Sequence, residues 1–340
     1  MALSRADNAY WCDHGYHHGE VVLRNLPEVC AIESTNYCNI KCIMCPRGEP
    51  DVMTRALGHM DNALFRRILD QAAFFSEPCW FHWFGEPLLN PRLFDQIALA
   101  KQRIPNLGIS TNATLLHARH ADQILDSGLD TLLIAIDGAT KEVYERTRKG
   151  PFAFEMVRDN ILQFLARKRQ RRQHRPRAIL SIIVMDSTES DLEAFRTYWT
   201  AHGADEVLFK PFVNWAGQDT IWTQLAVRGQ RAAFHSPRAH PCKLLWKSVV
   251  IAWDGRVVPC CYDYDARMAL GDLKTQSLAE IWNGPAYMAV RRAELAGCND
   301  SALCANCSQG PGHARDPNWG GPVRVEHSIP LPVISVRKAG

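Results

Sequence analysis

The chain has 340 residues, of which 46% are hydrophobic and 22% are charged, and its formal net charge is +3. This composition is ordinary for a soluble globular protein, and the length allows one large domain and a smaller one. No apolar run approaches the roughly 20 residues that span a bilayer, and the small charge favours no nucleic-acid partner. Residues 1–20 are polar and His-rich and lack a signal-peptide core, so we expect a cytoplasmic protein without a membrane segment.

The first 28 residues are interpreted as an N-terminal extension. They contain Cys12, His14, His17 and His18, which leaves a metal site as an alternative. Because termini are often loosely held, we favour solvent-facing histidines and assign this segment no chemistry.

Three cysteines follow the first predicted strand, with three and then two residues between them: Cys38, Cys42 and Cys45. A loop of this length can direct three sulfurs into one small volume. Three thiolates suit a [4Fe–4S] cluster and leave one iron without a protein ligand. Structural zinc is the alternative, but it needs four ligands, and no fourth Cys or His lies near in the sequence.

This Cys-x3-Cys-x2-Cys motif resembles the signature of the radical S-adenosylmethionine (SAM) superfamily. The resemblance implies that the open iron chelates SAM, and that an electron from the reduced cluster cleaves SAM to methionine and a 5′-deoxyadenosyl radical. It also implies a reductant of the flavodoxin or ferredoxin type. Met44 departs from the pattern, because the residue before the third cysteine is often aromatic in the family.

From residue 29 to 213, short apolar runs alternate with amphipathic ones. This alternation predicts parallel β/α units with right-handed crossovers. Six units are too few for a closed eight-fold barrel, and they match the partial (β/α)6 TIM-like barrel that the resemblance implies. The strands are predicted at 29–34, 80–84, 107–111, 131–136, 179–185 and 206–210, and the helices at 61–75, 91–103, 115–127, 154–169 and 188–202.

Polar groups follow three of these strands, at the end where parallel barrels place functional residues. They are Gly85, Glu86 and Pro87, then Ser110, Thr111 and Asn112, and then Asp137 and Gly138. The resemblance implies that the first group meets the SAM amino group and that the second hydrogen-bonds the ribose and the methionyl carboxylate. A turn explains the first and third groups equally simply, and a helix N-cap explains the second.

Residues 167–177 hold seven Lys or Arg residues. A phosphate-binding surface is one interpretation. The run has no aromatic residues for base stacking, and it falls at a predicted helix end, where basic residues are favourable. We therefore interpret it as a solvated surface.

A linker, residues 214–241, precedes a second group of cysteines. Its Trp215 and Trp222 are expected in the core, with a substrate wall as the alternative. Between Cys242 and Cys260, Asp254-Gly255 predicts a hairpin turn, and Cys304 and Cys307 follow later.

Residues 242–312 resemble the carboxyl-terminal extension called SPASM, or its shorter "twitch" form. The full extension carries seven cysteines for two auxiliary clusters, and no cysteine follows Cys307. The resemblance therefore implies one auxiliary [4Fe–4S] cluster, closed by four protein ligands and suited to electron transfer. We expect Cys242, Cys260, Cys304 and Cys307 as its ligands, with Cys298 as an alternative to one of them. Residues 313–340 form a tail of unassigned role.

Cys261 directly follows a predicted ligand. If this stretch is extended, its side chain points away from that of Cys260 and toward the cavity between the domains. A small buried apolar residue is the alternative interpretation.

The layout is similar to that of radical SAM epimerases and dehydrogenases of aminoglycoside pathways. It implies hydrogen abstraction from a carbinol C–H of a sugar or aminoglycoside-like substrate, with epimerisation by hydrogen return from Cys261. Two-electron oxidation to a ketone through the auxiliary cluster is the first alternative. Modification of a ribosomally made peptide is the second; with 28 residues before the first strand, no leader-binding domain is evident. A non-enzymatic electron carrier would leave the SAM-contact motifs without a role.

Overall fold

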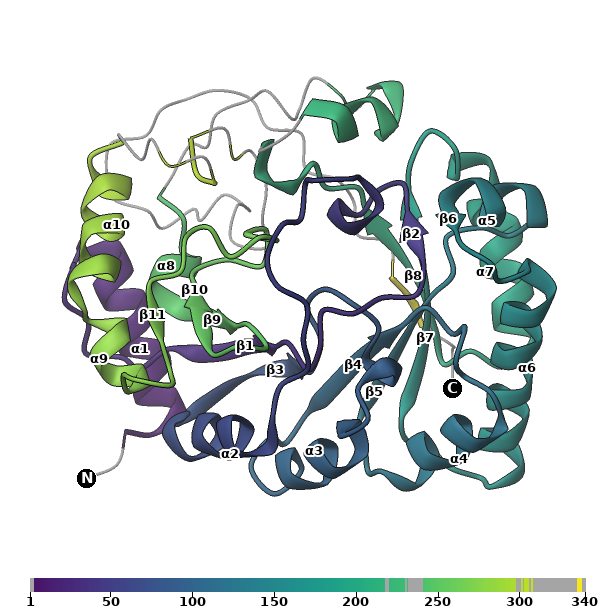
Figure 1. The fold of residues 1–340 in the computed structure, drawn as a ribbon, viewed down its shortest axis with the longest axis horizontal. Coiled ribbons are helices and arrows are strands. Elements are labelled where there is room, and N and C mark those ends of the chain that lie inside the picture. The colour runs from purple at the N-terminus through teal and green to yellow at the C-terminus, as the bar shows by residue number, and fades with distance from the viewer. Residues whose placement is uncertain are drawn as a thin grey trace.

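The computed structural model describes residues 3–217, 220–229, 231, 241–297, 301, 303–305, 307 and 335–337. Its framework is a sheet in which six parallel strands lie side by side in chain order, as Figure 1 shows. These strands are β1 (Glu28–Ile32), β3 (Phe74–Trp80), β4 (Leu107–Thr111), β5 (Thr131–Ala135), β7 (Arg177–Val184) and β8 (Glu206–Pro211).

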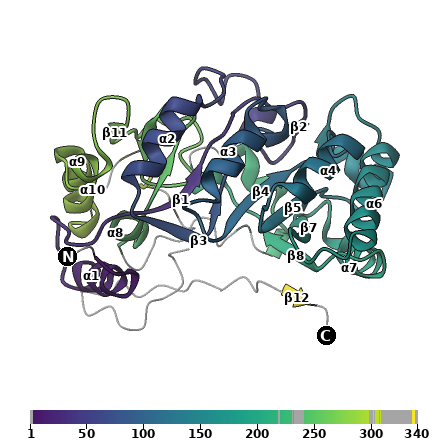
Figure 2. The same ribbon diagram turned by 90° about the horizontal axis from the view of Figure 1, so that it is seen from below.

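Helices cover the outer face of this sheet (Figures 1 and 2). They are α2 (Asn62–Gln71), α3 (Leu93–Ala100), α4 (Ala118–Asp126), α5 (Lys141–Thr147), α6 (Phe154–Gln170) and α7 (Leu192–Ala201). Alternate strand residues such as Leu132, Ile134 and Leu180 pack beneath them in the main core. The predicted partial barrel of six β/α units is confirmed.

Short elements complete this part of the chain. Two strands pair with each other beside the barrel, β2 (Lys41–Cys42) and β6 (Arg148–Lys149). Short 3-10 helices occur at η1 (Pro46–Gly48), η2 (Pro87–Leu89), η3 (Glu189–Asp191), η4 (Trp215–Gly217) and η5 (Thr220–Leu225).

The second predicted strand is wrong in position. The structure places it at Phe74–Trp80, paired in parallel with β1 and β4, whereas residues 81–84 form a loop. Phe81 and Phe84 are apolar because this loop is buried in the core, not because it is extended. The preceding helix accordingly ends at Gln71, and Gly85 lies five residues beyond the strand.

The carboxyl-terminal segment continues the same sheet. β9 (Ser248–Ile251) pairs in parallel with β1, β10 (Arg256–Val258) pairs antiparallel with β9, and β11 (Gly271–Asp272) follows β10. The predicted hairpin at Asp254-Gly255 is confirmed. Three helices flank it, α8 (Leu244–Lys247), α9 (Leu278–Trp282) and α10 (Pro285–Leu295). At the other edge, β12 (Ser335–Arg337) pairs antiparallel with β8.

The N-terminal extension is not loosely held. Residues Arg5–His17 form helix α1, capped by Ser4, whose hydroxyl accepts a hydrogen bond from the Asp7 amide. Cys12 and Tyr16 are buried against α8, and the Cys12 thiol donates to the Trp246 carbonyl at 3.3 Å. The buried residues of α1 are at positions 8, 12, 15 and 16, a helical spacing that places them on one face, toward the rest of the protein.

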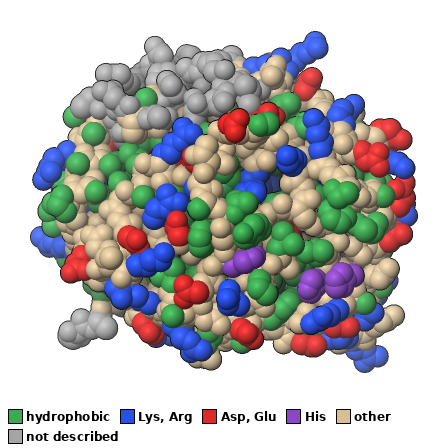
Figure 3. Space-filling model, viewed as in Figure 1, with side chains coloured by type: hydrophobic (Ala, Val, Ile, Leu, Met, Phe, Trp, Pro, Cys, Tyr) green, Lys and Arg blue, Asp and Glu red, His purple; other side chains and the backbone are tan. Residues whose placement is uncertain are grey.

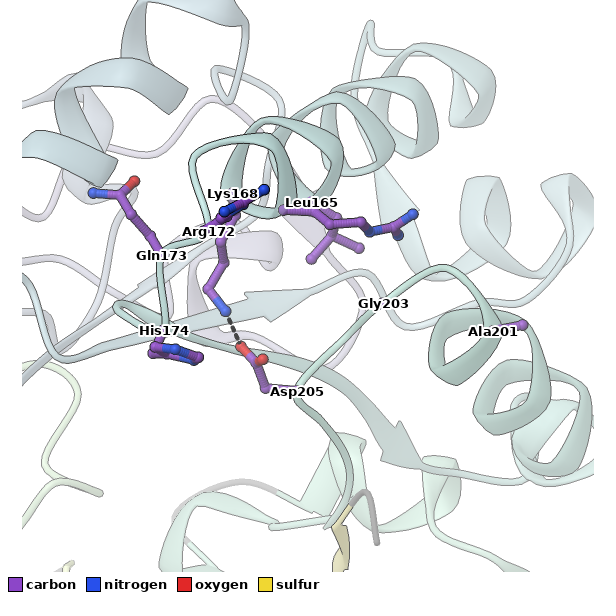
Figure 4. Close-up of a pocket in the computed structure, with 9 residues that line it drawn as sticks. Leu165, Lys168, Arg172, Gln173, His174, Ala201, Gly203 and Asp205 are labelled. Carbon is purple, nitrogen blue, oxygen red and sulfur yellow. Dashed lines mark hydrogen bonds and ion pairs between the residues drawn. The ribbon is translucent and has the colours of Figure 1, made fainter. Parts of the chain in front are cut away.

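The basic run surrounds a hollow at the edge of the molecule that Figure 4 shows. Lys168 pairs with Asp205 at 2.6 Å, and Arg171 pairs with Asp126 at 2.8 Å. Arg175 pairs with Asp130 and Arg177 with Glu206, near the amino-terminal ends of the strands. Acidic partners on neighbouring elements therefore compensate much of this charge.

In the part of the chain that the structure describes, no helix is both long and apolar enough to span a membrane.

Candidate active site

The three cysteines of the first motif lie in the loop after β1, which crosses in front of the strands in Figure 1. β2 anchors this loop, because Cys42 pairs with Arg148 and the Ile43 amide donates to the Thr147 carbonyl at 3.0 Å. The Cys45 amide donates to the Cys42 carbonyl at 3.1 Å, which turns the chain between the second and third cysteine. These backbone contacts fix the part of the loop that carries Cys42 and Cys45.

The three thiols lie near enough to act on one another electrostatically. Burial raises the pKa of the Cys45 thiol to about 11, and the neighbouring Cys38 thiol raises it further. Burial also raises the pKa of Cys42, with Arg148 opposing it and both other thiols adding to it. This donor set fits a [4Fe–4S] cluster, in which each iron takes one cysteine sulfur. No group of three Cys, His, Asp or Glu residues suited to a single metal ion occurs among the residues described.

A buried ion pair supports the loop from the side of the barrel. Arg148 donates to the Asp137 carboxylate at 2.6 Å, and the other Asp137 oxygen accepts the Ile183 amide at 2.7 Å. Asp137 therefore joins β7 to β6, the short strand that pairs with β2 of the cysteine loop. Asp137 thus has a structural role in linking these strands, which differs from both interpretations made from the sequence, a simple turn and a SAM contact.

Glu86 links the first two polar groups of the sequence motif. Its carboxylate accepts hydrogen bonds from the Thr111 hydroxyl at 2.8 Å, the Asn112 amide at 2.7 Å and the Leu88 amide at 3.1 Å. Burial raises its pKa to about 7, against the opposing effect of these bonds. Its own amide donates to the Tyr37 carbonyl at 2.7 Å, next to Cys38.

Gly85 is required by close approach of two backbones. Its φ is +93°, and a Cβ there would lie 2.6 Å from the Thr35 carbonyl oxygen and 2.7 Å from that of Tyr37. Pro87 follows as the first residue of η2. The Gly85-Glu86-Pro87 turn thus seats against the entry to the cysteine loop.

Asn112 and Ser110 lie differently. The side-chain amide of Asn112 donates to the Asn39 side-chain oxygen at 3.0 Å, and its nitrogen lies 3.9 Å from the Cys38 sulfur. Asn112 therefore contacts the cysteine loop. Ser110 lies deeper on the inner face of the barrel, where its backbone amide donates to His82 Nδ1 at 3.1 Å.

The four cysteines of the second group come together. Cys242, Cys260, Cys304 and Cys307 line one small cavity whose other walls are Ala216, Leu245, Pro259 and Leu303. Four thiols in an apolar enclosure fit a cluster with four protein ligands. Cys298, the alternative ligand, lies outside the described residues.

Cys261 corrects one expectation. The chain is not extended there, because β10 ends at Val258 and residues 261–262 form a turn. The adjacent Cys261 side chain raises the pKa of the Cys260 thiol. Cys261 nevertheless packs against the same small apolar cluster as Trp80 and Trp83, and its carbonyl accepts a hydrogen bond from the Trp83 indole at 2.7 Å. It therefore lies between the barrel and the second cysteine group.

A buried ion pair that the sequence did not reveal joins these two regions. Glu33, at the end of β1, forms a two-pronged pair with Arg55 at 2.5 Å, and both side chains are almost fully buried. Arg55 also donates to the Tyr264 carbonyl, and its backbone amide donates to Asp265. The charged residue Glu33 directly after an apolar strand was the one sequence feature that could have indicated a buried ion pair. No motif links positions 33 and 55.

The linker tryptophans close over the first cysteine loop. Trp222 is buried with Met44 and Phe84, and the Trp215 indole donates to the Met44 carbonyl at 2.9 Å. The core interpretation of Trp222 is confirmed.

Comparison with known proteins agrees with this geometry. Residues 32–197 match the model of the radical SAM superfamily, and residues 242–308 match SPASM, an iron–sulfur cluster-binding domain. The chain therefore contains a radical SAM domain and a SPASM domain. As a radical SAM enzyme with a SPASM domain, it uses SAM, a [4Fe–4S] cluster and auxiliary iron–sulfur chemistry. The boundaries 29–213 and 242–312 stay predictions.

Two curated relatives match most of this radical SAM enzyme. One is the tungsten-containing aldehyde ferredoxin oxidoreductase cofactor-modifying protein of Pyrococcus furiosus, 25% identical over 75% of this chain and 81% of the relative. The other is the S-adenosyl-L-methionine-dependent 2-deoxy-scyllo-inosamine dehydrogenase of Niallia circulans, 20% identical over 82% of this chain and 91% of the relative. A solved structure, native anSMEcpe with bound AdoMet and Cp18Cys peptide, shares the fold with a TM-score of 0.56 and 15% identity, over 82% of this chain and 88% of that one.

Proposed function

We propose that this enzyme abstracts hydrogen from a carbinol C–H of a sugar-like or aminoglycoside-like small molecule and inverts that carbon. The observation that carries the proposal is the position of Cys261, which packs against the same small apolar cluster as Trp80 and Trp83 and accepts the Trp83 indole hydrogen bond at its carbonyl. We propose that its thiol would face a substrate held on the inner face of the barrel.

The residues proposed to hold the cofactors divide by region. Cys38, Cys42 and Cys45 would hold the SAM-binding cluster, and Cys242, Cys260, Cys304 and Cys307 the auxiliary one. When bound, SAM on the first cluster supplies the radical that removes hydrogen, and the auxiliary cluster supplies an electron acceptor or donor. Gly85, Glu86, Pro87, Ser110 and Asn112 are proposed to shape the SAM site, with Glu86 and Asn112 acting through the loop contacts described above.

Inversion requires a hydrogen atom from the face opposite the abstraction. Cys261 would give its S–H hydrogen to the substrate carbon, forming a C–H bond and leaving a sulfur radical. One electron and one proton then restore the thiol, the electron coming from a flavodoxin or ferredoxin type of reductant. A substrate radical that instead loses a proton and an electron becomes a ketone.

Oxidation to the ketone is the second candidate. It is favoured by similarity over most of both chains to the 2-deoxy-scyllo-inosamine dehydrogenase. The two candidates place solvent hydrogen differently, because only the thiol route delivers exchangeable hydrogen to carbon.

The test is turnover in D₂O with the reduced enzyme and a panel of sugars and cyclitols. Epimerisation predicts one deuterium at the inverted carbon. The Cys261→Ala variant should form 5′-deoxyadenosine without epimer, whereas Cys30→Ala, which removes a thiol from the same packing cluster, should keep epimer formation. A ketone without deuterium would establish the second candidate, and unchanged epimer from Cys261→Ala would refute the role of that thiol.

A further inference from the structure

The inner face of the barrel carries a lysine for which the function so far gives no role. In β8, Val207 and Phe209 pack toward the helices with the main core. Lys210 therefore points to the opposite, inner face. It pairs in register with Ile183 of β7, whose amide donates to Asp137 beside the cysteine loop.

The inner face is open at this end of the strands. Inward-facing residues nearer the strand starts, such as Leu133 and Ile179, are buried. Those nearer the carboxyl ends, His82, Ser110 and Lys210, are only half-buried. Figure 3 shows Lys and Arg side chains around the central hollow of this face. Lys210 is thus held inside the barrel yet remains accessible from the mouth.

The charges around Lys210 leave it uncompensated. Asp137 and Arg148 both act on its ammonium, but they are paired with each other at 2.6 Å. Cys261 faces it from the second cysteine segment. Among the residues described, no carboxylate or carbonyl lies within hydrogen-bond or ion-pair distance of the Lys210 ammonium. A cation in such surroundings is costly unless an anion pairs with it.

The neighbouring polar groups are hydrogen-bond donors. His82 accepts the Ser110 amide at Nδ1, and burial lowers its pKa to about 3, so the ring is neutral and its Nε2–H is a donor. The Ser181 hydroxyl, deeper on the same face, is buried without a partner in the described structure. The His82 Nε2–H suits a substrate oxygen rather than a substrate ammonium group, and the Ser181 hydroxyl can donate to such an oxygen as well.

We propose that Lys210 binds an anionic oxygen of the substrate, so that the sugar-like substrate carries a carboxylate or phosphate at this position. The inference rests on the proposed function and narrows its substrate class to acidic sugars or cyclitols. Cys261 and the Asp137–Arg148 pair all act electrostatically on Lys210, and we expect an anion bound there to hold the ring near both cysteine regions.

The test is calorimetric binding to the anaerobically reconstituted holoenzyme with SAM. Four probes share one ring and differ in charge: glucose, glucosamine, glucuronate and glucose 6-phosphate. An anionic probe should bind at least about tenfold more tightly than glucose, with glucosamine weakest, as expected for a charge-assisted hydrogen bond. The preferred anion separates carboxylate from phosphate recognition.

Variants assign the preference to one residue. In Lys210→Met, the affinity for the anionic probe should fall to within about threefold of the affinity for glucose, because most of the charge-assisted bond is lost. Lys210→Arg should retain the preference for the anion. Lys274→Met, at an exposed turn after β11, is the matched control and should change nothing. If Lys210→Met fails to fold, the order of probe affinities for the unaltered enzyme tests the preference for an anion.

Two results would overturn the inference: glucosamine or glucose binding as tightly as either anion, or an anionic preference that survives Lys210→Met. The proposed function fails separately. Lys210-dependent binding of an anionic probe, with no acidic sugar or cyclitol ever epimerised or oxidised, keeps the subsite and refutes the function. Turnover of a neutral sugar that Lys210→Met does not affect would keep the proposed function and refute the anion subsite.

Discussion

At Glu86, one buried carboxylate accepts three hydrogen bonds and fixes the end of β4 beside the cysteine loop. Burial raises its pKa from the ordinary 4.5 to about 7, so the folded protein holds this proton more tightly than the unfolded chain does. The stability contributed by this proton is full below about pH 4.5 and is lost as the pH rises through about 7.

Glu86→Gln removes this titration. Relative to the variant, the wild-type protein should lose up to about 3 kcal/mol of unfolding free energy between pH 4.5 and 8. Anaerobic urea unfolding of both proteins at a series of pH values measures the difference. A difference that does not change with pH would show that Glu86 does not titrate in this range.

The sequence could predict which cysteines gather, because short spacings limit how far apart their sulfurs can lie. It could also place Asn112, which directly follows a correctly predicted strand. It could not predict the partners of Glu86 or the effect of Cys261 on the Cys260 thiol, because these depend on turns whose geometry no spacing defines. Lys210 was read only as a strand residue, since its isolation becomes visible once the inner face is assembled.

Between elements, the Glu33–Arg55 pair joins β1, the loop after the first cysteines and the turn that carries Tyr264 and Asp265. Arg55→Met leaves the Glu33 carboxylate buried and unpaired, and it should cost about 3–5 kcal/mol of unfolding free energy. A Glu33→Leu/Arg55→Met double variant should recover much of that loss, because no charge remains buried. Thermal or urea unfolding in a double-mutant cycle measures both.

Arg196→Met is the matched control, since Arg196 pairs with Glu193 on an exposed helix surface and should contribute little. Equal effects of Arg55→Met and Arg196→Met would mean that the buried pair does not hold the two regions together.

Element positions followed from the pattern where a strand has a continuous apolar centre, as for the strand predicted at residues 131–136 and observed at Thr131–Ala135. The misplaced second strand contains Ser76, Glu77 and Pro78, a sequence that argues against a strand interior, while the buried loop after it is apolar. Helix α1 was missed because its buried residues are few and polar residues surround them. In both cases tertiary packing outweighed the local pattern.

Across the whole molecule, one sheet runs from β11 through the barrel to β12. Its strands β9 and β10, which lie between Cys242 and Cys260 in the chain, continue the sheet directly beside β1, which leads into the first cysteine loop. The family comparison establishes the cofactor classes, and the geometry proposes their residues. The central claim is therefore that this chain holds two separate [4Fe–4S] clusters, one at Cys38, Cys42 and Cys45 and one at the second cysteine group.

Iron and sulfide analysis of the anaerobically reconstituted protein tests this claim most directly. We predict about eight iron atoms and eight sulfides per chain, falling to about four of each when Cys38, Cys42 and Cys45 are all replaced by Ala. Replacing Cys242, Cys260, Cys304 and Cys307 by Ala should likewise leave about four. About four iron atoms in the unaltered protein with none left in the first variant, or zinc in place of iron at the second group, would contradict the account.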